Sequence, residues 1–212
     1  MTFLRSKEMV RVRKCLAIMM LGAALAAGCD SREKGVGSPE PTDFAGQMAL
    51  AKRGNVAAQY NVAVCYMTGN GVASNEQAGV EWMVKAAMSG DGYAQFNLGV
   101  MYEKGMGVPK SGDEAIKWYR QAAERGHVMA QVNLGYCLFR GIGVKRNREE
   151  AARWFRLAAE AGDVNGQYHF GDCCYVGFGV PKDRETAISW YRKSAAQGCT
   201  EAKDRLREIG VK

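Results

Sequence analysis

The sequence predicts an all-α fold, a right-handed α-solenoid of helix-turn-helix repeats with a 36-residue period. Three observations predict it. A glycine-rich stretch returns four times at that interval, each interval holds two helical patterns of apolar residues, and residues that begin or end helices recur at fixed positions between them. A unit of two helices cannot bury its own apolar stripe, so successive units must stack in series.

The constant period is carried by glycine and tryptophan. The stretches GNGV, GMGV, GIGV and GFGV begin 36 residues apart, at Gly69, Gly105, Gly141 and Gly177. One tryptophan in each unit keeps the same interval, at Trp82, Trp118, Trp154 and Trp190. Glycines beside a lysine, as in GMGVPKS, could cradle a phosphate, but no copy completes a nucleotide-binding motif. Four copies at one period instead predict a turn, so these glycines and tryptophans are assigned a structural role.

The second helical pattern of each unit is the clearer one. Over residues 111–126 the apolar residues follow one stripe of an α-helix, at Ala115, Ile116, Trp118, Tyr119, Ala122 and Ala123. A residue that can cap a helix N-terminus precedes the pattern in every unit, at Asn75, Ser111, Asn147 and Asp183. Glutamate three residues after Ser111 and Asn147 predicts a reciprocal capping box. Glycines able to end the helix follow, at Gly54, Gly90, Gly126, Gly162 and Gly198.

The first helical pattern of each unit starts directly after that glycine. Asn55, Asp91 and Asp163 are expected to cap three of these helices. His127 and Cys199 stand at the same position, do not fit the preference, and predict frayed helix starts. The glycine-rich turn then joins the first helix to the second.

The N-terminal segment carries targeting information. Basic residues at 11–14 precede an apolar run, Leu16–Ala27, which is shorter than the roughly 20 residues that span a bilayer, so residues 1–28 are predicted to be a signal peptide. The run closes with LAAGC, which resembles the bacterial lipobox, and this predicts lipidation of Cys29. Plain secretion to the periplasm stays open. Residues 29–42 are polar and predict a flexible tether that holds the domain in the cell envelope, facing the periplasm.

The charge of the chain argues against nucleic acid as a partner. The formal net charge is +7, but the chain from Cys29 onward carries 24 basic and 21 acidic residues. That leaves +3, with no basic run or aromatic stacking pattern of the kind that nucleic-acid-binding domains show.

The repeat pattern closely resembles the Sel-1-like repeat, a relative of the tetratricopeptide repeat. The residues that carry the resemblance are Ala58, Val62, Ala63, Tyr66, Gly69, Gly71 and Val72 in the first half of a unit, and Ala115, Trp118, Tyr119, Ala122, Ala123 and Gly126 in the second half. The predicted solenoid spans residues 43–212. Its parts are a partial unit at 44–53, full units at 54–89, 90–125, 126–161 and 162–197, and a capping helix at 198–212.

The sequence offers little catalytic chemistry. His169 and Cys173 are spaced to bind a metal from one helical face, but His169 occupies the position of Asn61, Asn97 and Asn133 and is interpreted as a substitute for that amide. Ser31 and Lys34 form the S-x-x-K pair of penicillin-interacting enzymes, without its companion motifs. We therefore expect no catalytic residue, metal or cofactor. The alternative is an envelope enzyme or binding protein that acts on peptidoglycan or β-lactams.

Cysteine usage predicts thiols rather than a disulfide framework. Five cysteines follow Cys29, and an odd number cannot all pair within one chain. Three of them hold the same position on the first helix of different units, at Cys65, Cys137 and Cys173. Packed helices lie about 8–10 Å apart, farther than the roughly 7 Å that a disulfide allows between Cα atoms.

The resemblance implies a monomeric, non-catalytic scaffold that binds an unidentified protein or peptide on the face lined by its first helices. Positions that vary between units are the candidate contacts, because aromatic residues and arginine are favoured anchors in interfaces. They are Tyr136, Phe139, Arg140, Asp172, Tyr175 and Glu103. That these are ordinary, partly exposed residues of a solenoid remains the alternative.

Overall fold

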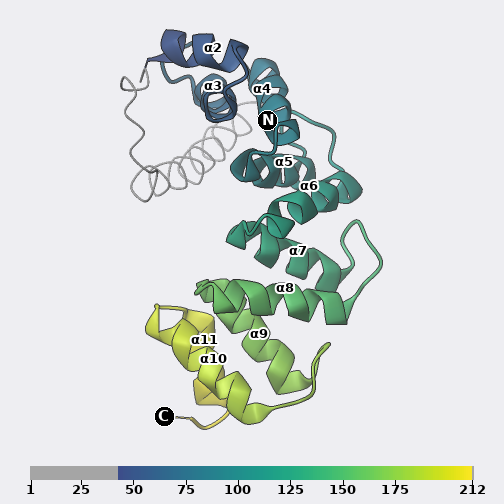
Figure 1. Ribbon diagram of the computed structural model, residues 1–212. Coiled ribbons are helices and arrows are strands. Elements are labelled where there is room, and N and C mark those ends of the chain that lie inside the picture. Colours follow the sequence, from purple (N-terminus) through teal and green to yellow (C-terminus); the bar gives the residue numbers. More distant parts are fainter. Residues whose placement is uncertain (1–42, 212) are drawn as a thin grey trace, which may run out of the picture. The chain divides into compact units, whose positions relative to one another are not determined.

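The computed structural model describes residues 43–211, and the described chain consists of helices joined by short turns, without a strand (Figure 1). The helices are α2 (Phe44–Lys52), α3 (Val56–Thr68), α4 (Glu76–Met88), α5 (Gly92–Lys104), α6 (Gly112–Glu124), α7 (Val128–Arg140), α8 (Arg148–Glu160), α9 (Val164–Val176), α10 (Arg184–Ala196) and α11 (Thr200–Glu208). Equivalent helices start 36 residues apart, from α3 to α9 and from α4 to α10. The predicted all-α repeat architecture is confirmed. The signal peptide, Cys29 and the tether lie outside the described residues.

The described chain has two compact units, residues 43–97 and 98–211, with the boundary inside α5. In the first unit α2 packs on α3, and α3 packs on α4. In the second unit each helix from α6 to α11 packs on the next one along the chain (Figure 1). Helices therefore lean on their neighbours in sequence, which is the organisation of a repeat array. Within residues 43–211 no helix combines the length and apolarity needed to cross a bilayer.

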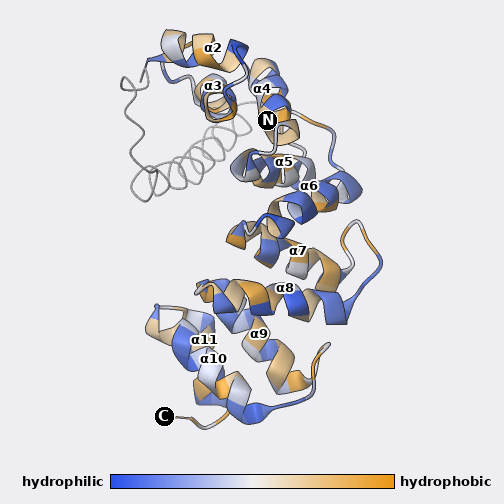
Figure 2. Ribbon diagram, in the orientation of Figure 1, coloured by the Kyte–Doolittle hydropathy of each residue, from blue (hydrophilic) through white to orange (hydrophobic). Residues whose placement is uncertain are grey.

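The second helices bury the predicted apolar stripe. In α6 the buried residues are Ala115, Ile116, Tyr119, Ala122 and Ala123, while Trp118 is half-buried. Every helix carries both hydrophobic and hydrophilic residues (Figure 2), so each can turn one face to its neighbours and one to solvent. The four predicted caps are also confirmed: Asn75, Ser111, Asn147 and Asp183 each accept a hydrogen bond from a backbone N–H in the first turn.

The reciprocal capping box is the exception. The backbone N–H of Ser111 donates to the carbonyl oxygen of Tyr102 at 2.9 Å, and that of Asn147 donates to Leu138 at 3.0 Å. The glutamate three residues on therefore has no cap N–H to accept. This bond ties the start of each second helix to the helix before it and closes the glycine-rich turn between them.

His127 is a working cap, contrary to the sequence expectation. Its Nδ1 accepts a hydrogen bond from the backbone N–H of Ala130 at 3.3 Å. Burial lowers the pKa of His127 to about 4, which keeps the imidazole neutral and Nδ1 free to accept. Cys199 makes no side-chain cap, as expected.

A small residue on the first helix faces a large one on the second helix of the same unit. A Cβ added to Gly99, Gly135 or Gly171 would lie 2.6–2.8 Å from the ring of Tyr119, Phe155 or Tyr191, respectively. In the first full unit the equivalent residues are Ala63 and Met83, both buried. Glycine is thus found where a flat ring lies against the helix, and alanine where a flexible methionine takes its place.

The glycine-rich turn of a repeat also contacts the repeat before it. Gly179, in the turn before α10, lies against the backbone at the start of α8, and Gly143 lies against Gly112 at the start of α6. Both have positive φ angles, +69° and +66°. Glycine serves two needs at these positions, since it allows the left-handed conformation and leaves room for another stretch of backbone.

Candidate functional site

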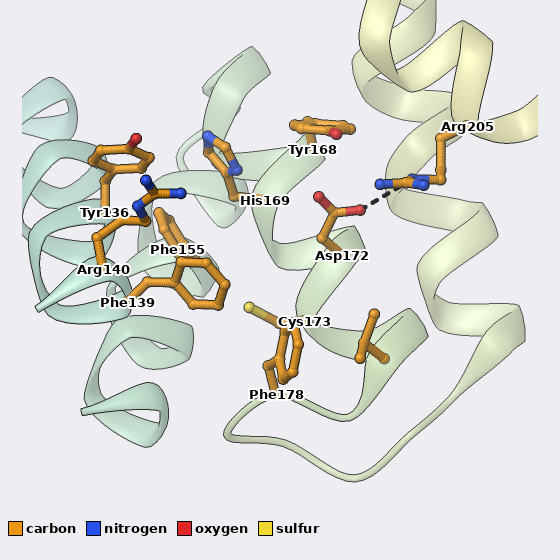
Figure 3. Close-up of a pocket in the computed structure, with 11 residues that line it drawn as sticks. Tyr136, Phe139, Arg140, Phe155, Tyr168, His169, Asp172, Cys173, Phe178 and Arg205 are labelled. Carbon is orange, nitrogen blue, oxygen red and sulfur yellow. Dashed lines mark ion pairs between the residues drawn. The ribbon is translucent and has the colours of Figure 1, made fainter. Parts of the chain in front are cut away.

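A cavity of about 240 Å³ opens within residues 98–211, among the first helices of successive repeats. Its walls come from α7, α9 and α11, with one ring from α8 and one from the turn after α9. Figure 3 shows Tyr136, Phe139 and Arg140 of α7 on one side, and Asp172 of α9 with Arg205 of α11 on the other. The regular 36-residue spacing of the helices positions these side chains, because it brings equivalent faces of α7 and α9 together.

Aromatic rings form most of the cavity wall. The ring centroids of Phe139 and Phe178 lie 5.5 Å apart, and the buried ring of Phe155 comes from α8. Tyr136 stands at the rim and is 43% exposed. The Cys173 thiol also lines the cavity, and burial raises its pKa to about 12, so it is present as a neutral thiol at neutral pH.

Phe155 helps to explain why this part of the chain is apolar. Its position is filled by tyrosine in the neighbouring units, and each tyrosine hydroxyl donates to a carboxylate: Tyr119 to Glu103 and Tyr191 to Asp172, both at 2.7 Å. Phenylalanine has no hydroxyl, and position 139, which is equivalent to Glu103, is also phenylalanine. Because this repeat lacks both the tyrosine hydroxyl and the carboxylate that would accept from it, neither group is left buried without a partner.

Arg140 is a cation whose charge no described carboxylate pairs. Within residues 43–211 no carboxylate lies within ion-pair distance of its guanidinium, whose Cζ is 5.9 Å from the Tyr136 ring centroid. The equivalent residue of the previous unit, Lys104, is paired with Glu103 at 2.8 Å. Because Phe139 stands where that glutamate would be, this repeat unit supplies no neighbouring carboxylate on the same helix for Arg140.

Asp172 is held on the opposite wall. It accepts a hydrogen bond from Tyr191 Oη at 2.7 Å and lies 3.4 Å from Arg205 Nε, so α9, α10 and α11 meet at this carboxylate. Figure 3 marks the ion pair with a dashed line. Because the Asp172 carboxylate is already paired, Asp172 shapes the cavity but adds little to its net charge.

His169 does not replace the structural amide, as the sequence had suggested. Asn61 donates to Gln47 and Asn97 donates to Tyr60, each at 3.1 Å. The imidazole of His169 makes no hydrogen bond to another described residue and packs among rings, with centroid distances of 4.9 Å to Phe155 and 5.2 Å to Tyr168. Burial lowers the pKa of His169, partly offset by nearby carboxylates, so the ring is neutral. Its nitrogens are polar groups of the cavity wall.

Two of the six candidate contact residues lie elsewhere. Tyr175 is half-buried and is not part of the cavity wall. Glu103 accepts hydrogen bonds from Tyr119 and Lys104, and these outweigh the effect of burial and lower its pKa. Its carboxylate therefore has a structural role.

Several cavity residues had not been singled out from the sequence as partner contacts. Phe155, Tyr168 and Val176 look like ordinary solenoid positions, and Arg205 looks like a polar residue of the capping helix. The one available signal was the departure from the repeat at two positions, His169 in place of asparagine and Phe155 in place of tyrosine.

The remaining chemical candidates stay separate from this site. Ser31 and Lys34 lie outside the described residues. All five described cysteines are free thiols, of which Cys137, Cys173 and Cys174 are buried. In the described part of the chain no three histidine, cysteine, aspartate or glutamate side chains are grouped so that they could hold a metal ion.

Comparison with known proteins identifies the repeat. The family described as "Sel1 repeat" matches four times, at residues 56–91, 92–127, 128–163 and 164–199. A solved Sel1 repeat protein from Oxalobacter formigenes is similar at 39% identity and a TM-score of 0.73, over 78% of this chain and 69% of that one. The c5321 protective antigen of uropathogenic Escherichia coli is similar at 34% identity and a TM-score of 0.75, over 81% of this chain. This chain spans only 38% of the length of c5321. Comparison with curated proteins gives no match.

Proposed function

Because the chain belongs to the Sel1 repeat family, we propose that it is a monomeric, non-catalytic scaffold that binds a partner protein on the face formed by α7, α9 and α11. Sel1 repeat proteins generally bind other proteins, and their fold is typical of a non-catalytic interaction scaffold. The observation that carries the choice of face is the cavity, in which aromatic rings surround an opening edged by Arg140, which has no ion-pair partner among residues 43–211.

The chemistry of this face suits protein recognition. Tyrosine and arginine are enriched among the residues that dominate binding energy, particularly where they border a pocket that excludes water. Here Tyr136 and Arg140 stand at the rim, and buried or half-buried rings form the wall. Apart from Phe178, which lies in the turn after α9, they project from helices whose mutual packing is already set, so little conformational entropy is lost on binding.

Site-specific crosslinking tests this choice. A photo-reactive residue placed at Tyr136 should capture a partner protein in intact cells, whereas one placed at Leu157 should not. The two positions are matched, since Tyr136 is 43% exposed and Leu157, on α8 and away from the cavity, is 41% exposed. Equal capture from both positions, or capture from Leu157 alone, contradicts the assignment of the face.

We further propose that the chain is held in the bacterial cell envelope by a lipid on Cys29. The LAAGC sequence at residues 25–29 supports this, since a thiolate is the nucleophile that forms the thioether to a lipid. Mass spectrometry of the N-terminal peptide from membranes should find a modified Cys29. An unmodified N-terminus in the soluble periplasmic fraction would instead show that the chain is secreted.

A further inference from the structure

We propose that the cavity among α7, α9 and α11 binds an internal acidic segment of the partner, in which one large apolar side chain is flanked by aspartate or glutamate. This rests on the proposed function and names the kind of peptide that the same face recognises. Two observations carry it, the unpaired positive charges at Arg140 in the wall and at Arg148 behind the Phe178 ring, and the size of the hollow.

The excess charge comes from two arginines next to the Phe139–Phe178 ring pair. Arg140 follows Phe139 directly in α7, and the Cζ atom of Arg148 lies 4.8 Å from the Phe178 ring centroid. Neither guanidinium has a carboxylate within ion-pair distance in the described part of the chain. Arg205, by contrast, is paired with two carboxylates, Asp172 and Glu208. A ligand of complementary charge is therefore anionic.

The hollow is the size of one side chain. A cavity of about 150 Å³ can hold benzene, so the volume of about 240 Å³ here suits one aromatic or leucine-sized group. Drug-sized ligands occupy larger pockets, of roughly 300–1,000 Å³. The rings of Phe139, Phe155 and Phe178 offer apolar contact to such a group, while the nitrogens of His169 can hydrogen-bond to the peptide that carries it.

The arrangement favours an internal segment over the end of a chain. A terminal carboxylate supplies one negative charge against the two positive charges of Arg140 and Arg148. Acidic side chains before and after the apolar residue supply two or more negative charges, enough to match both arginines. Guanidinium groups bind carboxylates through paired, charge-assisted hydrogen bonds.

Fluorescence anisotropy with a short labelled peptide tests the proposal on the chain purified from expressing cells. The peptide has a central phenylalanine flanked on each side by two glutamates, and both of its ends are blocked. We expect binding that weakens as salt is added. Replacing the glutamates by glutamine, or the phenylalanine by serine, should each weaken binding roughly tenfold or more. A fourth peptide, uncharged except for a free carboxylate on a C-terminal phenylalanine, should bind no better than the glutamine peptide.

Matched protein variants locate the binding. Arg140→Gln should weaken binding of the glutamate peptide roughly tenfold, since a hydrogen bond to a charged group contributes about 1.5–3 kcal/mol. Lys104→Gln removes a cation from the equivalent position of the previous unit, where Glu103 is its partner, and should change binding less than about twofold. The circular dichroism of both variants should match that of the unchanged chain.

Three results overturn the proposal: equal binding of the glutamine peptide, preference for the free C-terminal carboxylate, or equal effects of Arg140→Gln and Lys104→Gln. If the glutamate peptide fails to bind while crosslinking from Tyr136 still captures a protein, the acidic-segment proposal is wrong and the proposed scaffold function stands. If crosslinking from Tyr136 also captures nothing, both are wrong.

Discussion

The contact between the turn before α10 and the start of α8 makes a strong prediction about stability. Gly179 has a φ angle of +69°, and an added Cβ would meet the carbonyl group of Arg148 and lie 2.7 Å from the Cα of Glu149. Gly162 has a φ angle of +90°, and nothing lies within 4 Å of its added Cβ. Alanine at either position must adopt a left-handed conformation, but only at Gly179 must it also displace backbone.

The two substitutions therefore separate conformational strain from close packing. A left-handed alanine costs about 1–2 kcal/mol, and this should be the whole effect of Gly162→Ala. Overpacking adds about 1–3 kcal/mol, and the neighbours of Gly179 are backbone atoms that cannot rotate away. We expect Gly179→Ala to lower the free energy of unfolding by about 2 kcal/mol more than Gly162→Ala does.

Urea unfolding followed by far-ultraviolet circular dichroism measures both variants. A repeat array can lose its end units first, so hydrogen exchange of the amides in α8 and α10 should accompany the unfolding curves. Gly179→Ala is expected to speed exchange in both helices, and Gly162→Ala to do so less. Equal losses of stability in the two variants would refute the reasoning, because the contact between successive units would then contribute nothing beyond strain.

Three further predictions concern residues 98–211. Burial lowers the pKa of His127 from 6.5 to about 4, so its contribution to stability should be undiminished above pH 6.5 and fall by roughly 3 kcal/mol as the pH drops towards 4. His127→Asn keeps a cap and should remove this part of the pH dependence while leaving the part that comes from His169, as urea midpoints across the range would show. Gly135→Ala should cost about 2 kcal/mol because its Cβ would lie 2.8 Å from the Phe155 ring, and adding Phe155→Met should restore part of the loss in a double-mutant cycle. Burial raises the pKa of the Cys137 thiol to about 11 and that of the Cys173 thiol to about 12. Both thiols should therefore react slowly with a thiol reagent at pH 8 in the folded chain and readily after unfolding. Rapid reaction of the folded chain would contradict their burial.

The sequence alone predicts the repeat because the repeat depends on local and periodic rules. The caps at Asn75 and Ser111, the glycines of positive φ and the apolar stripe of α6 all follow from residue type and spacing. His127 was misjudged because residue preference ranks histidine below asparagine, whereas burial makes its neutral ring a usable acceptor. The predicted capping box is not formed, because the backbone N–H of the cap residue donates to a backbone carbonyl of the preceding helix instead.

The cavity could be predicted only in part. Variation between units pointed to Tyr136, Phe139, Arg140 and Asp172, which line it. The same reasoning included Glu103, whose carboxylate already accepts two hydrogen bonds. A list of variable positions cannot tell a free polar group from a paired one, since that depends on which side chain of the adjoining helix reaches it.

The pairing of glycine with a ring has an evolutionary consequence. Gly99 with Tyr119, Gly135 with Phe155 and Gly171 with Tyr191 each lie within one period of the chain. Recombination at the unit boundaries would therefore carry both members of a pair together, and a duplicated or deleted copy would arrive with its own complementary partner. Copy number can change in such a gene without the interface inside any repeat unit having to be rebuilt, while each copy remains free to diverge on the face that meets other molecules.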